Sequence, residues 1–393
     1  MNVVPAHGPT DAKIAIVGEA PGKDENEIGI PFVGAAGMLL EEVLRRANIT
    51  RKLTKHYEVG YGHRVSVESE VFVTNLIDYF PGRGVDFAKE FYADKKRITP
   101  GSELLAGYDR VAAELAKVNP NIIVPLGEHA LRAVCRRYGI TKWRGSILES
   151  TLLPGKKVVP AIHPAAVLRE YSFKQLLIAD CKRIKEESTT ATISLPKRTF
   201  VIRPTLDQVL QAEQRLVAAE YCGFDIETKY NNIACVGFAD SPEWAICIPL
   251  LAGQKPYWAT VAEEVRVWQA INNILRCPSK KIAQNTLFDE SHLACHGVRI
   301  NNRWFDTMLA QNVLYPELEK SLAILTSIYT REPYYKDEGR AALKKKHEKA
   351  WDPNQADEAL WKYNCKDCCC TVEAAFAQQK DMLETKLDRR TIA

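Results

Sequence analysis

The chain has 393 residues, of which 46% are hydrophobic and 26% charged, and its formal net charge is +4. This composition is ordinary for a globular protein, and the length predicts two domains rather than one. No run of roughly 18 apolar residues is present, and the N-terminus lacks the basic-then-apolar order of a signal peptide, so we expect a cytoplasmic protein with no membrane partner. So small a net charge does not by itself indicate a nucleic-acid binder.

The first half alternates short apolar runs with amphipathic stretches. Residues 12–17, 70–77, 121–127 and 157–164 read as strands, and residues 38–47, 103–118 and 128–139 read as helices. This alternation predicts an α/β sandwich with a mainly parallel sheet and helices on both faces. Such sheets bind ligands at the carboxyl ends of their strands. The segment 18–37 after the first strand is rich in glycine and acidic residues, and it predicts a pocket rather than core.

The polar stretch near residue 190 separates this pattern from a second one. We predict a first domain over 1–190, a linker over 191–198 and a second domain over 199–393. The second domain begins with a strand-like segment and a helix at 206–219. A further strand follows at 221–229, and residues 232–240 and 243–250 read as two more strands of a meander.

Acidic residues of the second domain suggest a metal site. Asp225 and Glu227 are two apart in a strand, so they share one face, and a divalent cation between them would relieve their repulsion. A solvated edge strand is the alternative. Tyr363 and Asp367 are four apart in a helical segment and also share a face.

Together with Asn285 and Asp289, these residues follow the pattern D-x-E, N-x-x-x-F-D, Y-x-x-x-D. Over about residues 199–385 the chain thus resembles the DEDDy 3′→5′ exonuclease domain of family A DNA polymerases, and residues 304–339 resemble the corresponding stretch of phage polymerases. The resemblance implies an RNase H-like fold with a mixed sheet. It also implies two Mg²⁺ or Mn²⁺ ions, since both metals prefer oxygen ligands.

The exonuclease resemblance assigns each of these residues a role. Asp225, Glu227, Asp289 and Asp367 are the expected metal ligands, Tyr363 is expected to orient the attacking water, and Asn285 is expected to contact substrate. Because polymerase domains are not seen after this domain, a separately encoded DNA polymerase is a candidate partner. A phage protein acting in the host cytoplasm is the context that the resemblance suggests.

The segment 18–37 begins GEAPG and ends with G-x-PF-x-G-x-AG. Three later segments follow in order: VTNLIDYFP at 73–81, PNIIVPLGEHAL at 120–131 and AIHPAAVLR at 161–169. Over about residues 10–185 the set resembles the uracil-DNA glycosylase superfamily, closest to its family 4. The resemblance implies excision of uracil from DNA. The expected partner of the whole chain is uracil-containing DNA, as a single strand or a 3′ end.

Several residues acquire expected roles in uracil recognition. Gly18 and Gly22 let backbone approach a flipped nucleotide, Phe32 offers a stacking ring, and the amide of Asn75 can pair with uracil O4 and N3. His163 can donate to uracil O2, where negative charge develops. Leu168 can wedge into the gap left by the flipped base, and Arg169 can hold a phosphate. By resemblance, Glu19 helps to position the water, and Glu25 is the candidate for excluding the thymine methyl.

Two departures from family 4 qualify this interpretation. Many family 4 enzymes hold an iron–sulfur cluster on four cysteines, but only Cys135 and Cys181 fall within the first 190 residues, so we expect no cluster. The family's P-G-N-R is PGRG here. The alternative is therefore a 3′→5′ exonuclease whose glycosylase-like domain is inactive and serves as a DNA-binding or processivity module.

Overall fold

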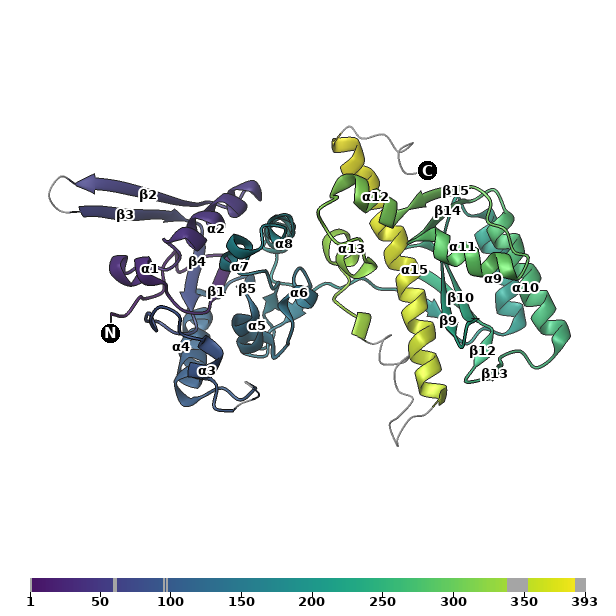
Figure 1. Cartoon of the computed structure of the whole chain (residues 1–393), viewed down its shortest axis with the longest axis horizontal. Coiled ribbons are helices and arrows are strands. Elements are labelled where there is room, and N and C mark those ends of the chain that lie inside the picture. The colour runs from purple at the N-terminus through teal and green to yellow at the C-terminus, as the bar shows by residue number, and fades with distance from the viewer. Residues whose placement is uncertain (1, 59–61, 95, 97, 338–352, 386–393) are drawn as a thin grey trace. The chain divides into compact units, whose positions relative to one another are not determined.

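The computed structural model describes residues 2–58, 62–94, 96, 98–337 and 353–385 (Figure 1). The chain divides into two compact units, Met1–Ser194 and Leu195–Ala393, and the division falls within the segment 191–198. Residues 338–339 of the phage-like stretch and residues 386–393 of the second unit lie outside the described part. Among the described helices, none has the length and apolar character needed to cross a membrane.

The first unit is built on a five-stranded sheet in the order β4-β1-β5-β7-β6, and its first four strands are parallel. Only β7 and β6 pair antiparallel. The predicted mainly parallel sheet is confirmed. The strands are β1 (Ile14–Gly18), β4 (Val71–Asn75), β5 (Ile122–Pro125), β6 (Leu148–Glu149) and β7 (Lys157–Val158).

Helices pack on both faces of this sheet. Ala15 and Val17 of β1 belong to a core that includes Leu104 and Leu131 of α4 (Ser102–Val118) and α5 (Glu128–Cys135). Alternate strand residues point to the opposite face, where α8 (Phe173–Glu187) contacts β5. The other helices are α1 (Lys23–Ile28), α2 (Ala35–Arg46), α3 (Phe87–Phe91), α6 (Ile140–Trp143) and α7 (Pro164–Arg169).

Two elements of this unit were not expected from the sequence. The strands β2 (Arg51–Glu58) and β3 (Gly62–Ser69) pair antiparallel and form a separate two-stranded ribbon. The helix α1 lies inside the segment 18–37, for which the sequence predicted a pocket and no helix. Its first turn carries Asp24 and Glu25, acids that favour a helix N-terminus.

The second unit contains a six-stranded mixed sheet in the order β15-β14-β9-β10-β11-β8, as the sequence predicted. Strands β9, β10 and β11 form an antiparallel meander, while β14, β15 and β8 add in parallel. The strands are β8 (Thr199–Val201), β9 (Tyr221–Lys229), β10 (Asn232–Ser241), β11 (Trp244–Pro249), β14 (Lys280–Ala283) and β15 (Arg303–Asp306), with a small pair β12 (Leu251–Ala252) and β13 (Lys255–Pro256).

The two faces of this sheet carry different helices. Phe224 and Ile226 of β9 face a core formed with α9 (Leu206–Ala218) and α10 (Val261–Arg276). The long helix α15 (Pro353–Glu384) crosses the other face, as Figure 1 shows in yellow. Three further helices in the described part of this unit are α11 (Thr286–Cys295), α12 (Thr307–Leu314) and α13 (Leu322–Tyr329).

Two glycines let α15 approach the sheet closely. A Cβ on Gly237 would lie 2.2 Å from Oδ1 of Asn364, and one on Gly223 would lie 2.4 Å from Cγ2 of Val372. Gly237 is paired with Asp225 across β9 and β10. The absence of a side chain therefore brings the Asn364 turn of α15 against the strand that carries the acids.

Candidate active sites

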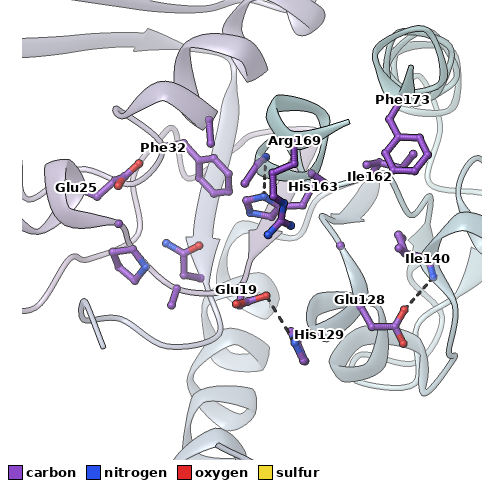
Figure 2. Close-up of a pocket in the computed structure, with 18 of the residues that line it drawn as sticks. Glu19, Glu25, Phe32, Glu128, His129, Ile140, Ile162, His163, Arg169 and Phe173 are labelled. Atoms are coloured by element: carbon purple, nitrogen blue, oxygen red, sulfur yellow. Dashed lines mark hydrogen bonds and ion pairs between the residues drawn. The ribbon is translucent and has the colours of Figure 1, made fainter. Parts of the chain in front are cut away.

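A pocket of about 520 Å³ opens at the carboxyl ends of the parallel strands of the first unit. Its lining includes Glu19, Asn75 and Gly127, which directly follow or end β1, β4 and β5. His163 completes the wall immediately before α7. Figure 2 shows Phe32, His163 and Arg169 close together, with Glu19 pointing toward His129. The fold thus gathers into one pocket residues from four separate segments of the sequence.

The amide of Asn75 is poised as a recognition group. Its side chain is buried, and Oδ1 has no hydrogen-bond partner. A buried acceptor without a donor costs about 1–3 kcal/mol, so a ligand that supplies an N–H would gain from meeting it. Phe32 is close by, because a Cβ on Gly18 would approach both the Asn75 amide and the Phe32 ring. Phe32 has φ 55°, a left-handed conformation that a non-glycine residue seldom adopts.

Substituting Gly18 by alanine is expected to close this part of the pocket. The new methyl would lie 2.2 Å from Oδ1 of Asn75 and 2.7 Å from Cζ of Phe32, so both side chains must shift. We expect a loss of about 1–3 kcal/mol in unfolding free energy and a larger loss of affinity for uracil-containing DNA. Chemical denaturation and fluorescence anisotropy would measure the two effects. Gly18 is not among the glycines with a positive φ, so the expected losses come from the steric clash and not from backbone strain.

The imidazole of His163 is held neutral and in one tautomer. Burial, with a smaller contribution from Arg169, lowers the pKa of His163 to about 4. Its Nδ1 accepts a hydrogen bond of 3.1 Å from the backbone N–H of Ala165, at the start of α7. The single ring proton of the neutral form therefore resides on Nε2, which makes that atom a donor. The Phe32 and His163 ring centroids are 5.6 Å apart.

The carboxylate of Glu19 occupies a different side of the pocket. Burial raises its pKa to about 7, against a lowering effect of Arg169. Nε2 of His129 lies 3.8 Å from Oε2 of Glu19, and Nδ1 of His129 lies 3.1 Å from the hydroxyl of Tyr92. The sequence interpretation missed His129, although it lies in the GEHAL segment. Its position beside Glu19 depends on folding α5 against β1.

The other predicted residues of this pocket also lie at it or next to it. Glu25 is buried and lines the pocket, and its Oε1 accepts from the backbone N–H of Gly34. Its Oε2 fills the space beside Gly22, since a Cβ added to Gly22 would lie only 2.4 Å from that oxygen. Arg169 lines the pocket at the end of α7. Leu168 precedes it and is 55% exposed, so its side chain is accessible to a partner.

In the second unit, three of the predicted metal ligands converge. Carboxylate oxygens of Asp225, Glu227 and Asp367 lie within 4.8 Å of one another. Burial and the neighbouring carboxylates raise the pKa of both Asp225 and Glu227. Such raised pKa values mark a site where negative charge is costly until a cation arrives. The oxygen-only donor set suits a hard divalent ion.

Asp289 adjoins this cluster, whereas Asn285 lines a second pocket. Oδ1 of Asp289 accepts from the backbone N–H of Ile226 at 2.9 Å, and burial raises the pKa of Asp289 to about 7. Asn285 precedes α11 and lines a second pocket of about 750 Å³, whose lining does not include the three clustered carboxylates. Contact of Asn285 with substrate stays a prediction. Asp306 caps α12, because its Oδ1 accepts from the backbone N–H groups of Met308 and Leu309.

Three residues around the cluster were missed from the sequence. Nζ of Lys336 lies 2.7 and 2.6 Å from the two oxygens of Asp367 and 3.0 Å from the hydroxyl of Tyr363. The hydroxyl of Tyr335 donates to Oδ1 of Asp367 at 2.6 Å, and Nδ2 of Asn364 donates to Oδ2 of Asp225 at 2.8 Å. Asn364 could have been suspected, since it follows Tyr363 inside the Y-x-x-x-D pattern, but Lys336 carries no local signal.

The two sites define the class of protein: a two-domain α/β enzyme with a ligand pocket in one unit and a carboxylate site in the other. Residues 5–182 match the family model of the uracil DNA glycosylase superfamily, and residues 200–382 match that of a 3′-5′ exonuclease. The type-4 uracil-DNA glycosylase of Thermotoga maritima is 32% identical over 188 residues, which cover 47% of this chain and 82% of that protein.

Two other comparisons concern polymerases and nucleases. A DNA polymerase of Bacillus phage SP01 is 27% identical over 173 residues, which are 44% of this chain and 15% of that protein. The crystal structure of the Aedes aegypti Nibbler EXO domain aligns with a TM-score of 0.35 and 15% identity, covering 49% of this chain and 91% of that one. The chain belongs to the uracil-DNA glycosylase superfamily through its first unit, and its second unit is a 3′-5′ exonuclease domain.

Proposed function

We propose that this protein excises uracil from DNA with its first unit and removes nucleotides from DNA 3′ ends with its second. The first activity rests on one observation: Asn75, whose Oδ1 has no hydrogen-bond partner, and the neutral His163 line the same pocket. The second rests on the convergence of Asp225, Glu227 and Asp367. Each unit has the donor set that its reaction requires.

Recognition of uracil follows from the groups that line the pocket. Oδ1 of Asn75 accepts from uracil N3–H and its Nδ2 donates to O4, a pattern that cytosine cannot satisfy. Phe32 stacks on the base. Glu25 beside Gly22 bounds the pocket where the thymine methyl would enter. Leu168 is exposed enough to enter the gap that the flipped base leaves between its neighbours, and Arg169 holds a flanking phosphate.

The glycosidic bond breaks as negative charge accumulates on uracil O2. The Nε2 proton of His163 donates to that oxygen, because Nδ1 is already engaged by Ala165. Glu19 orients the attacking water on the opposite side and accepts its proton. Water then adds to the sugar C1′, and uracil leaves with the electron pair of the broken bond. His129 holds the Glu19 carboxylate in position.

The rate of uracil release is expected to depend on pH through Glu19. A base acts when it is deprotonated, and the pKa of Glu19 is about 7, so the rate should rise through pH 7 and level off above it. The pKa of His163 is near 4, so this residue adds no transition above pH 5. Single-turnover release of labelled uracil in EDTA between pH 5.5 and 9 would measure this profile. Glu19→Gln should flatten it and slow release about 10²–10⁴-fold, and a flat wild-type profile would count against Glu19 as the base.

In the exonuclease unit, Asp225, Glu227, Asp289 and Asp367 are proposed to hold two Mg²⁺ or Mn²⁺ ions. When bound, these ions stabilise the attacking and leaving oxygens of the phosphodiester. The hydroxyl of Tyr363 orients the attacking water, and Asn364 holds Asp225 through a hydrogen bond of 2.8 Å. Asn285 contacts the terminal nucleotide.

The iron–sulfur cluster of type-4 glycosylases does not fit this chain. A four-iron cluster takes four cysteine thiolates, but residues 1–194 contain only Cys135 and Cys181. Both are buried free thiols. Burial raises the pKa of Cys135 to about 12 and also raises the pKa of Cys181, so neither is a ready thiolate. No step of the proposed reaction uses a cluster.

The substrate is proposed to be uracil-containing DNA presented as a single strand or a 3′ end. A separately encoded DNA polymerase is the candidate partner, in the setting of phage replication or repair in the host cytoplasm. Because the two units are tethered, each has a raised effective concentration near the DNA product that the other unit releases. The second candidate function, an exonuclease with a silent glycosylase-like module, is favoured by PGRG at Pro81–Gly84 in place of the family's PGNR.

One experiment separates these functions. A 5′-labelled oligonucleotide with a single internal uracil is incubated with the protein in EDTA, then treated with hot alkali. One alkali-dependent cut at the uracil is the expected result, and Asn75→Ala should abolish it. No cut, with a 3′ ladder returning when Mg²⁺ is added, would leave an exonuclease with a silent recognition module.

A further inference from the structure

Lys336 places a positive charge directly on a proposed metal ligand. Its Nζ contacts both oxygens of Asp367 at 2.7 and 2.6 Å, and its side chain is only 10% exposed. The same ammonium donates a hydrogen bond of 3.0 Å to the hydroxyl of Tyr363. Three directed contacts from one buried ammonium distinguish it from a surface ion pair, which is worth little.

The charge of Lys336 acts on the whole carboxylate cluster. It offsets the negative charges of Asp225 and Glu227 as well as that of Asp367. Oδ1 of Asp367 also accepts from Tyr335, so this carboxylate is committed to protein donors through both of its oxygens. A divalent cation on Asp367 would share a carboxylate with an ammonium and be repelled by it at close range.

We propose that Lys336 is a built-in competitor of the divalent cation at Asp367, so that loading the exonuclease site requires the ammonium to leave this carboxylate. The inference rests on the proposed metal-dependent exonuclease activity of this unit. Once displaced, Lys336 stays within reach of Tyr363, where it can face the negative phosphate of the substrate. The lysine thus limits charge repulsion among the acids until metal and DNA arrive together.

Binding of Mn²⁺ to the full chain in the absence of DNA tests this competition directly. Electron paramagnetic resonance of free Mn²⁺ during titration gives the Kd without any turnover. Lys336→Met should bind Mn²⁺ about tenfold more tightly than the wild type, the order expected when one competing charged hydrogen bond is removed. Lys336→Arg keeps the charge and should stay near the wild-type Kd. Lys362→Met, at an exposed lysine on α15, is the matched control.

Thermal unfolding supplies an independent readout. In EDTA, Lys336→Met should melt below the wild type, because the acids lose their cation, and the Tm gain on adding Mn²⁺ should be larger in the variant. If Lys336→Met does not fold, Lys336→Gln retains a hydrogen-bond donor and is measured in its place. An unchanged or weaker affinity for Mn²⁺ in the neutral variants overturns the proposal. If the wild type and the neutral variants all bind no Mn²⁺, the proposed metal-dependent function is instead overturned.

Discussion

Asp225→Asn is expected to abolish 3′ degradation, by about 10³-fold or more, because it removes a carboxylate from the centre of the proposed metal cluster. The fold should not suffer. Burial and the neighbouring carboxylates raise the pKa of Asp225. At pH values above the unfolded-state pKa, the ionised carboxylate therefore lowers the free energy of unfolding, and a neutral amide removes that cost. We therefore expect a Tm in EDTA equal to or above that of the wild type. Degradation of a 5′-labelled single strand in Mg²⁺, with calorimetry in EDTA, measures both effects.

The control for this prediction is a carboxylate of the same unit outside the cluster. Glu319→Gln changes an exposed side chain and should leave 3′ degradation unchanged. Uracil release in EDTA should also be the same in Asp225→Asn as in the wild type, since that site lies in the other unit. Retained exonuclease activity in Asp225→Asn would remove the carboxylate cluster from the reaction.

His163→Asn is expected to slow uracil release about 10²–10³-fold, the usual cost of losing one donor to a developing oxyanion. Asparagine is a good N-cap, so it can replace the contact by which Nδ1 of His163 accepts from Ala165 at the start of α7. Its shorter side chain cannot place a donor where Nε2 of the imidazole stands. The rate of release should therefore fall while the Tm changes little.

Single-turnover release from uracil-containing DNA, measured in EDTA, checks the His163 prediction. Binding of the same DNA by anisotropy should weaken much less than the rate, because the donor acts mainly on the charge of the transition state. His7→Asn, at a histidine of the same unit that does not line the pocket, is the control. Equal rates in His163→Asn and the wild type would assign the oxyanion contact to another residue.

Much of the architecture was predictable because it depends on local pattern. Alternation of apolar runs with amphipathic stretches predicted the mainly parallel sheet of the first unit, and the i, i+2 spacing of Asp225 and Glu227 predicted that they share a face of β9. The ribbon β2–β3 and the helix α1 were not predicted. The ribbon is a two-stranded element outside the main sheet, and α1 lies in a glycine-rich segment for which the sequence predicted a pocket and no helix.

The sequence by itself determined the fold class, the two families and the site residues that occur at recognisable spacings. These features depend on motifs and apolar periodicity within short segments of the chain. Only the tertiary structure decided which groups touch. Lys336 meets Asp367 from 31 residues away, and His129 meets Glu19 because α5 follows β5, a sheet neighbour of β1. Tertiary structure also decided the tautomer of His163 and the raised pKa of Glu19, since both follow from burial and hydrogen bonding that local sequence does not encode.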